Sequence, residues 1–139
     1  MKPANDTTLN DFVIRFANVN GSGSASANGM FAKALFRMGI PVSTRNIFPS
    51  NIEGLPTWFE VRVNHRGYLG RREGVDIMVA MNAETFEEDV NSLLPGGYLV
   101  YDNSKELPKS LLRPDINLIG VPICLLYTSQ SPRDLSTSR

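Results

Sequence analysis

The chain has 139 residues, of which 42% are hydrophobic and 20% are charged, and its formal net charge at pH 7 is zero. This is ordinary for one globular domain with its own core, and the neutral balance gives no electrostatic reason to expect a nucleic-acid partner. No apolar run reaches the roughly 18 residues of a membrane span. A single cysteine, Cys124, argues against an internal disulfide and an all-cysteine iron–sulfur cluster. A single histidine, His65, argues against a zinc site and a Ser-His-Asp triad.

The chain begins with a polar segment and a strand. Residues 1–10 lack the apolar core of a signal peptide, so we expect a disordered lead-in and a cytoplasmic protein. The strand at 12–19 is apolar on both faces. This pattern is typical of a central, covered strand in a mostly parallel sheet.

A loop of small residues, 20–29, joins this strand to a helix. Glycines let the backbone approach an anion and a helix N-terminus carries partial positive charge, so this order of elements is typical of phosphate sites in α/β proteins. We expect Ser24 or Ser26 to cap the helix and Gly39 to end it. Apolar residues of the helix recur at helical spacing, at positions 27, 30, 31, 34, 35 and 38.

Two further strands are predicted in the middle of the chain. The first covers 42–48 and leads into a loop, 49–56, that is too rich in turn residues to be regular. The second, 57–64, alternates in the way a half-exposed strand does, and a turn follows it. Its two faces carry Trp58, Glu60 and Arg62 on one side and Phe59, Val61 and Val63 on the other.

The second half of the chain alternates strands with one helix. A buried strand at 75–81 leads to a helix at 83–94, whose acidic residues lie near its favoured N-terminal half. Residues 95–97 break this helix, and strands at 98–102 and 116–122 follow. Together the elements predict an α/β fold, namely a three-layer αβα domain with a mostly parallel sheet.

We divide the chain into three parts. Residues 1–10 are the lead-in, and 11–122 form the α/β domain. Residues 123–139 lose both hydrophobic periodicities and are rich in Ser, Thr, Arg and Pro. We interpret them as a non-native tail that follows a domain truncated at its C-terminus, with a natural disordered tail as the alternative.

The glycine loop is the first candidate site. Gly21-Ser22-Gly23 starts as a Rossmann fingerprint does, with Ser26 at the third position, but the expected acidic residue about 20 positions further on is missing and Arg45 lies there instead. No Walker A lysine follows either. The loop is a candidate for meeting an anionic group, and a tight strand–helix connection without a ligand is the alternative.

The other polar groups have a functional and a structural interpretation. Neighbouring arginines can grip phosphates, but a solvated hairpin face balanced by Glu60 and Glu73 explains them equally well. Core packing is the favoured role of Trp58, and a solvated helix face that of the acidic residues at 84–89. Both interpretations stay open for Asp76. No nucleophile–base pair or metal-binding group emerges, so no catalytic or metal-ligating residue is assigned. The basic group consists of Arg62, His65, Arg66, Arg71 and Arg72.

Five blocks of sequence, specific in combination, lie at 16–29, 36–42, 46–58, 76–82 and 95–98. With them, residues 12–121 resemble the γ-type domain of 2-oxoacid:ferredoxin (acceptor) oxidoreductases. The resemblance is strongest to the N-terminal part of the α subunit in the 2-oxoglutarate/pyruvate ferredoxin oxidoreductase family. It implies a fold like catalytic domain III of pyruvate:ferredoxin oxidoreductase.

The resemblance implies an enzyme that oxidatively decarboxylates a 2-oxoacid, with 2-oxoglutarate favoured, to an acyl-CoA and passes electrons to ferredoxin. It implies thiamine diphosphate, magnesium and an iron–sulfur cluster in the full complex, held by the remaining α-subunit domains and a thiamine-binding β subunit rather than by this chain alone. The domain itself is expected to support coenzyme A binding and subunit assembly, and the fragment alone is expected to be inactive.

The same resemblance suggests contacts to the phosphates of coenzyme A. A stand-alone α/β module that binds a phosphorylated or nucleotide ligand without redox chemistry remains the alternative function. No nucleic-acid or membrane partner is expected. The candidate coenzyme-binding residues are Gly21, Ser22, Gly23, Ser24, Asn28, Arg45 and Arg71.

Overall fold

The computed structural model describes residues 10–18, 24–48 and 57–123. The glycines predicted to bind an anion, the irregular loop at 49–56 and the tail from 124 onward lie outside these ranges. In chain order the elements are β1 (Asp11–Asn18), α1 (Ser24–Arg37), β2 (Val42–Ile47), β3 (Thr57–Asn64), β4 (Val75–Ala80), the 3₁₀ turn η1 (Ala83–Thr85), α2 (Phe86–Ser92), β5 (Leu93–Asp102), the 3₁₀ turn η2 (Lys109–Leu111) and β6 (Asn117–Val121).

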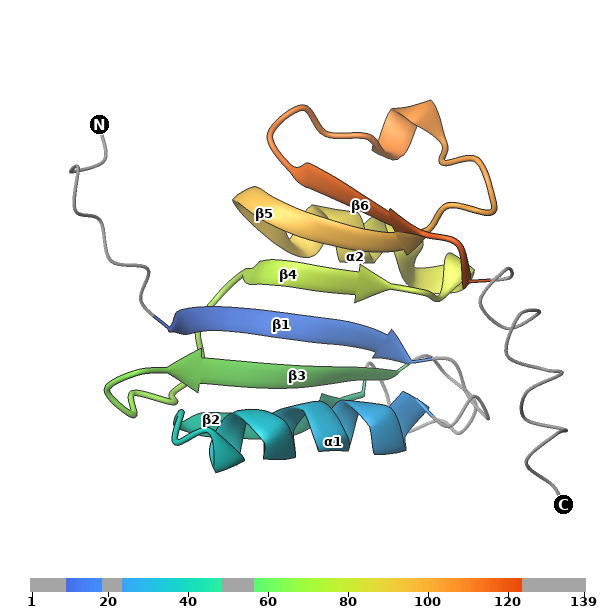
Figure 1. Cartoon of the computed structure of the whole chain (residues 1–139). Coiled ribbons are helices and arrows are strands. Elements are labelled where there is room, and N and C mark those ends of the chain that lie inside the picture. Colours follow the sequence, from blue (N-terminus) through green and yellow to red (C-terminus); the bar gives the residue numbers. More distant parts are fainter. Residues whose placement is uncertain (1–9, 19–23, 49–56, 124–139) are drawn as a thin grey trace, which may run out of the picture.

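The described strands form one six-stranded sheet in the order β2-β3-β1-β4-β5-β6 (Figure 1). β1 pairs in parallel with β4, β4 with β5, and β5 with β6. β3 runs antiparallel to both of its neighbours, β1 and β2. Because β1 lies between β3 and β4, the prediction of a central first strand in a mostly parallel sheet is confirmed.

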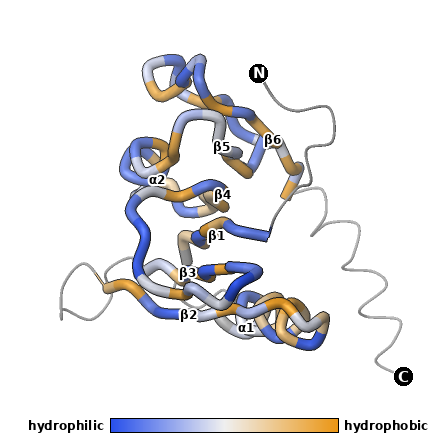
Figure 2. Tube along the Cα trace, turned by 90° about the vertical axis from the view of Figure 1, so that its left-hand side faces the viewer, coloured by the Kyte–Doolittle hydropathy of each residue, from blue (hydrophilic) through white to orange (hydrophobic). Residues whose placement is uncertain are grey.

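The two helices cover opposite faces of this sheet, as Figure 1 and Figure 2 show. Alternate residues of β1 separate two cores: Ile14 clusters with Ala32 of α1, whereas Val13 clusters with Val90 of α2. Successive side chains of a strand point to opposite faces, so a central strand needs apolar residues at both kinds of position. The helix–sheet–helix arrangement confirms the predicted three-layer domain.

α1 ends as the sequence predicts. The backbone N–H of Gly39, at a φ of 84°, donates to the carbonyl oxygen of Phe36, and the N–H of Ile40 donates to that of Leu35. These two bonds form a Schellman cap, and Leu35 and Ile40 belong to the same apolar cluster. At the other end, α1 already includes both Ser24 and Ser26, so neither of the two predicted residues is the N-cap.

The buried face of α1 differs from the predicted apolar stripe. Phe31, Ala32 and Leu35 join the core over the sheet, whereas Met30 is 69% and Met38 73% exposed. A helix on the outer layer of a sheet buries only a narrow stripe, so apolar residues on its flanks stay in solvent. The exposed members of the predicted stripe are Ala27, Met30, Ala34 and Met38.

β3 has the predicted bounds and the predicted division of side chains between its faces, but it is not half-exposed. Val61 and Val63 are fully buried under α1, and Trp58 and Glu60 are only 4% exposed on the opposite face. α2 packs mainly on β4 and β5, and its Asp89 accepts a hydrogen bond from Trp58 of β3. Arg15 and Arg45 cover Glu60, as described below.

The second helix is shorter than predicted. η1 precedes α2, which ends at Ser92, and β5 begins at Leu93 instead of residue 98. The predicted helix breaker at 95–97 lies inside β5, where the register against β4 shifts. Gly97 suits this bulge, because a Cβ at this position would lie 2.8 Å from the carbonyl oxygen of Asp76.

Candidate functional site

The carboxyl ends of the parallel strands form the first candidate site. Ligands of open α/β sheets bind at this edge, where the chain departs in opposite directions from two neighbouring strands. That point lies between β1, which leads to α1 and β2 on one side, and β4, which leads to α2 and β5 on the other. α1 starts beyond the carboxyl end of β1, and its first turn carries no acidic residue. Its partial positive charge is therefore available at this edge.

The predicted loop residues lie partly within the described chain. Gly21, Ser22 and Gly23 fall outside it, so their role stays a prediction. Ser24 is the first residue of α1. Asn28 lies one turn further along and is 6% exposed, on a helix that packs against β1, β2 and β3. The structure thus places both described members of the set in the first turns of the helix that follows β1.

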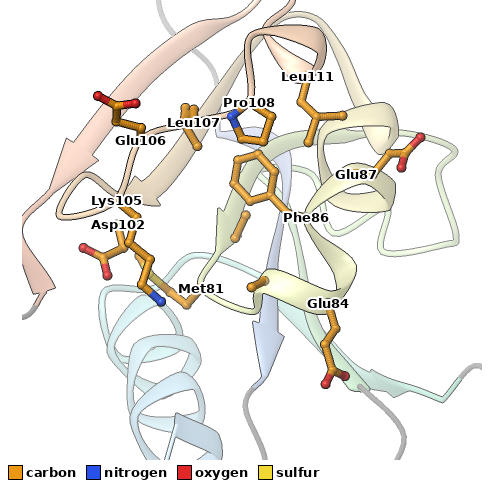
Figure 3. A pocket seen from close by; sticks show the side chains of 12 residues that line it. Met81, Glu84, Phe86, Glu87, Asp102, Lys105, Glu106, Leu107, Pro108 and Leu111 are labelled. Carbon is orange, nitrogen blue, oxygen red and sulfur yellow. The ribbon is translucent and has the colours of Figure 1, made fainter.

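A cavity of about 350 Å³ opens at the same edge (Figure 3). It is bounded by the ends of β4 and β5, the start of α2 and the segment that contains η2. Figure 3 shows the ring of Phe86 close to Pro108, with Leu107 and Leu111 beside them, so one wall is apolar. A concave site of this size with an apolar wall is typical of small-molecule binding.

The rim of this cavity is acidic. The hydroxyl of Ser104 donates to Oδ1 of Asp102 over 2.7 Å and its backbone N–H donates to the same oxygen over 3.0 Å. These bonds hold the pKa of Asp102 below its usual value, so this carboxylate is ionised at neutral pH. An excess of three negative charges disfavours a phosphate here. The charged lining residues are Glu84, Glu87, Asp102 and Glu106 against Lys105.

A buried ion pair lies on the α2 side of the sheet, over β1, β3 and β2. The side chain of Glu60 is 5% exposed. Arg15 donates from Nε and Nη2 to Oε2 over 3.1 and 2.7 Å, and Arg45 donates from Nε to Oε1 over 2.8 Å. Each carboxylate oxygen has its own arginine, which offsets the cost of removing the charge from water.

The prediction that Glu60 balances a solvated hairpin face is wrong. The strand register explains its burial, because Arg15 of β1 and Arg45 of β2 are both direct partners of Glu60 in β3. The two arginines approach the carboxylate from opposite sides and exclude solvent from it. Of the two predicted counter-charges only Glu73 is exposed.

A second group of charges joins the start of β1 to the loop at 65–74. Oδ1 of Asp11 lies 2.7 Å from Nη1 of Arg62 and 3.6 Å from Nη1 of Arg72. Arg72 also lies 3.3 Å from Oδ1 of Asp76, whose Oδ2 accepts from the N–H of Val13 over 2.8 Å. Asp76 therefore has a structural role. The hydrogen bond from Arg62 is the main cause that lowers the pKa of Asp11.

A smaller cavity, of about 60 Å³, lies beside these arginines, between β2, β3 and the loop at 65–74. Arg45 and Arg71, both predicted to bind phosphate, line it together. Arg45 is paired with Glu60, whereas Arg71 is exposed and makes no ion pair with any described residue. The loop joins β3 to β4 at the amino ends of the parallel strands, so Arg71 and Ser24 belong to opposite edges of the sheet.

The sequence did not predict that Asp89 of α2 is buried and hydrogen-bonded to Trp58 of β3 and Thr85 of η1. Asp89 is 1% exposed; its Oδ1 accepts from Nε1 of Trp58 over 2.7 Å and its Oδ2 from the hydroxyl of Thr85 over 2.9 Å. Burial raises the pKa of Asp89 to about 6. The interpretation of residues 84–89 as a solvated face is thus wrong for Asp89, while core packing of Trp58 is confirmed. The sequence signal that could have indicated this contact is Thr85, which lies four positions before Asp89 and therefore on the same side of the helix.

The described residues offer no donor set for a metal. Across 10–18, 24–48 and 57–123, no three His, Cys, Asp or Glu side chains lie close enough to hold an ion. His65 is exposed in the turn after β3, where its backbone N–H donates to the carbonyl oxygen of Asn10. No helix in these ranges is both long and apolar enough to cross a membrane.

Comparison with known proteins connects this fold to one enzyme family. Residues 13–128 match the family described as pyruvate ferredoxin/flavodoxin oxidoreductase. Subunit alpha of 2-oxoacid:ferredoxin oxidoreductase 2 from Aeropyrum pernix is 28% identical over 92 residues, which make up 66% of this chain and 14% of that subunit. The 2-oxoglutarate:ferredoxin oxidoreductase of Magnetococcus marinus, solved with 2-oxoglutarate, coenzyme A and succinyl-CoA bound, is 25% identical with a TM-score of 0.76, covering 88% of this chain and 22% of that one.

Two further solved proteins share the fold at lower identity. The gamma subunit of a keto/oxoacid ferredoxin oxidoreductase from Geobacter sulfurreducens has a TM-score of 0.66 at 19% identity, covering 87% of this chain and 66% of that one. Pyruvate oxidoreductase subunit PORC from Thermotoga maritima has a TM-score of 0.56 at 21% identity, covering 81% and 60%. The chain spans 14% of the A. pernix subunit and 22% of the M. marinus protein. The resemblance that its sequence blocks predicted is confirmed. The chain belongs to the pyruvate ferredoxin/flavodoxin oxidoreductase family.

Proposed function

We propose that this chain is a domain of a 2-oxoacid:ferredoxin oxidoreductase that converts a 2-oxoacid and coenzyme A to an acyl-CoA. The family match over residues 13–128 carries the proposal, and the likeness to the M. marinus enzyme supports it. That enzyme was solved with 2-oxoglutarate bound, which favours 2-oxoglutarate as the substrate class. Since the chain spans 22% of that protein, the reacting groups belong to the rest of the complex.

The reaction breaks the bond between the carboxylate carbon and the oxo carbon, releases carbon dioxide and joins the acyl group to the sulfur of coenzyme A. The thiol of coenzyme A loses its proton to solvent, and the two electrons that are released pass to ferredoxin. Thiamine diphosphate with magnesium and an iron–sulfur cluster supply this chemistry in the full complex. We assign these groups to the remaining α-subunit domains and a thiamine-binding β subunit; the described residues of this chain bring no donor set for a metal.

The contribution of this domain is to hold phosphates of coenzyme A at the carboxyl edge of its sheet. The strand–loop–helix unit from β1 to α1 supplies backbone N–H groups and a helix N-terminus without acidic residues. Gly21, Ser22, Gly23 and Ser24 are the proposed contacts, with Asn28 supporting them from the next turn. The acidic cavity beside this edge disfavours phosphates, so it suits an uncharged part of the coenzyme.

Steady-state kinetics of the complete enzyme complex test this contact. A bulky residue in the loop keeps the backbone from approaching the anion, so Gly23→Val is expected to raise the KM for coenzyme A roughly tenfold or more, the equivalent of one lost charge-assisted hydrogen bond. Gly29→Val is the matched control, because a Cβ at this helical position meets nothing within 4 Å. An unchanged KM in Gly23→Val would remove the loop from the coenzyme site. That result would not contradict the proposal that the chain belongs to the complex. Acceptor reduction by the unaltered complex tests that proposal separately.

The outer face of α1 is the proposed assembly surface for the remaining α-subunit domains. Phe36 is 70% exposed, Met30 69% and Met38 73%, although apolar side chains of this size are usually buried. Figure 2 shows apolar residues along α1, on the side of the sheet away from α2. Exposed apolar patches on a domain mark surfaces that another protein segment covers. This chain covers 14% and 22% of the larger relatives, which are therefore long enough to supply such a segment.

Substitution of Phe36 tests the assembly surface. In the complete complex, Phe36→Ser is expected to lower the assembled fraction in size-exclusion chromatography, while the 139-residue chain keeps its unfolding midpoint, since the side chain lies in solvent. Tyr68→Ser is the control, because Tyr68 is similarly exposed, at 67%, but belongs to the loop at 65–74 and not to α1. Equal assembly of Phe36→Ser and the unaltered protein would contradict the assignment.

A further inference from the structure

The small cavity of about 60 Å³ between β2, β3 and the loop at 65–74 has no part in the proposed contact to coenzyme A. One water molecule needs roughly 10–15 Å³ of such space. The cavity can therefore hold a group larger than a single water. Four of its lining residues, Ser43, Arg45, Arg62 and Arg71, carry side-chain hydrogen-bond donors. Arg45 is already engaged by Glu60.

Arg62 has a buried donor without an acceptor. Its Nη1 donates to Oδ1 of Asp11 and to the carbonyl oxygens of Phe12 and Val63. Its Nε, in contrast, is buried and has no hydrogen-bond partner among the described residues. Buried polar groups are nearly always paired, so an unpaired buried N–H needs an explanation. A negative charge in the adjoining cavity, which Arg62 lines, offsets the charge of this guanidinium without contact to Nε itself.

Arg71 is the second unsatisfied cation at the cavity. It makes no ion pair with any described residue, yet the loop that carries it is held at both ends. At the start, Oδ1 of Asn64 accepts from the N–H groups of Arg66 and Tyr68 over 2.8 and 3.1 Å. At the end, Arg72 is anchored by its two carboxylate partners. Arg71 is thus positioned at the cavity by its neighbours and keeps its own donors available.

The charge of this region favours a divalent anion. Five arginines gather here against three carboxylates, an excess of two positive charges, and the carboxylates are already engaged by Arg15, Arg45, Arg62 and Arg72. A phosphate group at neutral pH carries one to two negative charges and several acceptor oxygens. Guanidinium groups match these oxygens in geometry and charge. The three carboxylates are those of Asp11, Glu60 and Asp76.

We propose that this cavity binds a phosphate group, with the guanidinium of Arg71 and the hydroxyl of Ser43 as its donors and the charge of Arg62 beside it. The site lies toward the amino edge of the parallel strands, whereas the proposed coenzyme contact lies at their carboxyl edge. Inorganic phosphate and a phosphate ester share this chemistry. The site is therefore a second anion site of the domain, separate from the glycine loop.

The test is a titration of the 139-residue chain with inorganic phosphate at constant ionic strength, with chloride as the compensating anion. The Nε–H resonance of Arg62, assigned by its loss in Arg62→Lys, is expected to shift and saturate. Arg71→Gln is expected to weaken binding roughly tenfold or more, as for a lost hydrogen bond to a charged group. Arg66→Gln removes the same charge from the same loop outside the cavity lining, so it should change the affinity less than twofold.

Two outcomes would overturn the proposal. No saturable shift of the Arg62 resonance means that water alone fills the cavity. Equal weakening by Arg66→Gln and Arg71→Gln means that the loop attracts anions without a defined site. Glycerol phosphate in a parallel titration distinguishes the sources: a lower Kd than that of inorganic phosphate identifies an ester as the ligand, and an equal or higher Kd identifies the free ion. No enzyme assay enters the test, so its outcome is independent of the coenzyme proposal.

Discussion

Two cavities of the domain differ in size and in charge. The cavity between β4, β5 and α2 is about 350 Å³ and has four carboxylates and one lysine on its rim. The cavity between β2, β3 and the loop at 65–74 is about 60 Å³ and lies among five arginines and three carboxylates. The two lie toward opposite ends of the sheet. A formal net charge of zero for the whole chain therefore conceals an acidic and a basic region. Local potential, and not the total, decides where an anion binds.

The two regions also differ in how they hold their charge. On the basic side Glu60 is buried and fully hydrogen-bonded, so its arginines are fixed in place. On the acidic side the carboxylates lie around an open rim, and Asp102 accepts hydrogen bonds from Ser104 and from the N–H of Ile123 but pairs with no arginine. We therefore expect substitutions on the basic side to affect folding most and those on the acidic rim to affect ligand preference.

The largest expected effect comes from Glu60. Glu60→Gln keeps the shape of the side chain but leaves Arg15 and Arg45 facing each other without a counter-ion, so it should lower the free energy of unfolding by about 3 kcal/mol. Urea denaturation of the 139-residue chain measures this. Glu73→Gln, at an exposed position, serves as the control and should change stability little. A loss below about 1 kcal/mol in Glu60→Gln would show that solvent screens the pair.

An intermediate effect is expected from Asp89, on the helix that borders the acidic cavity. Its pKa is about 6 in the folded chain, raised first by burial, and near 3.8 when unfolded. The folded state thus binds more protons between these values, so stability falls as pH rises from about 4 to 6 and is constant above. Asp89→Asn removes this dependence. The free energy of unfolding of Asp89→Asn, relative to that of the unaltered chain, should therefore rise by about 2–3 kcal/mol between pH 4 and pH 7.

Denaturation at several pH values checks the assignment to Asp89. Glu88, its exposed neighbour, raises the pKa of Asp89 and Arg15 lowers it, both as minor causes. Glu88→Gln should therefore leave most of the pH dependence in place. A stability difference between Asp89→Asn and the unaltered chain that does not vary with pH would contradict the raised pKa.

The smallest expected effect comes from Asp11, the more exposed anchor of the basic side. Its side chain is 42% exposed, so Asp11→Asn should cost less than about 1 kcal/mol despite the 2.7 Å contact to Arg62. Because Arg62 lowers the pKa of Asp11, this contribution is present at neutral pH and is lost as pH falls through the folded pKa. A loss equal to that of Glu60→Gln would remove the distinction between buried and exposed anchors.

The strand pattern was the most predictable part of the fold. Alternation gave the bounds of β3 correctly and placed Trp58 and Glu60 on one face, because period-two patterning reflects backbone geometry directly. It could not show that this face is buried, since the cover comes from Asp89 of α2 at Trp58 and from Arg15 and Arg45 of other strands at Glu60. Burial by partners that are distant in sequence leaves no local pattern.

The helices were less predictable for a related reason. The Gly39 cap of α1 is a local signal and was correct, whereas the choice of buried face depends on how the helix lies over the sheet, and Met30 proved exposed. Asp89 looked like one more acidic residue of a solvated helix until its partner Trp58 was placed above it by the fold. Of the candidate site, Arg71 could be named from sequence, but its cavity could not, because that depends on the course of the loop.

The most direct test of the account is a structure of the complete complex with coenzyme A bound. The account predicts that phosphate oxygens of the coenzyme lie within hydrogen-bond distance of the backbone N–H groups at residues 21–24, at the carboxyl edge beside the acidic cavity. Coenzyme phosphates seated instead on Arg62 and Arg71, or on no residue of this chain, would contradict it.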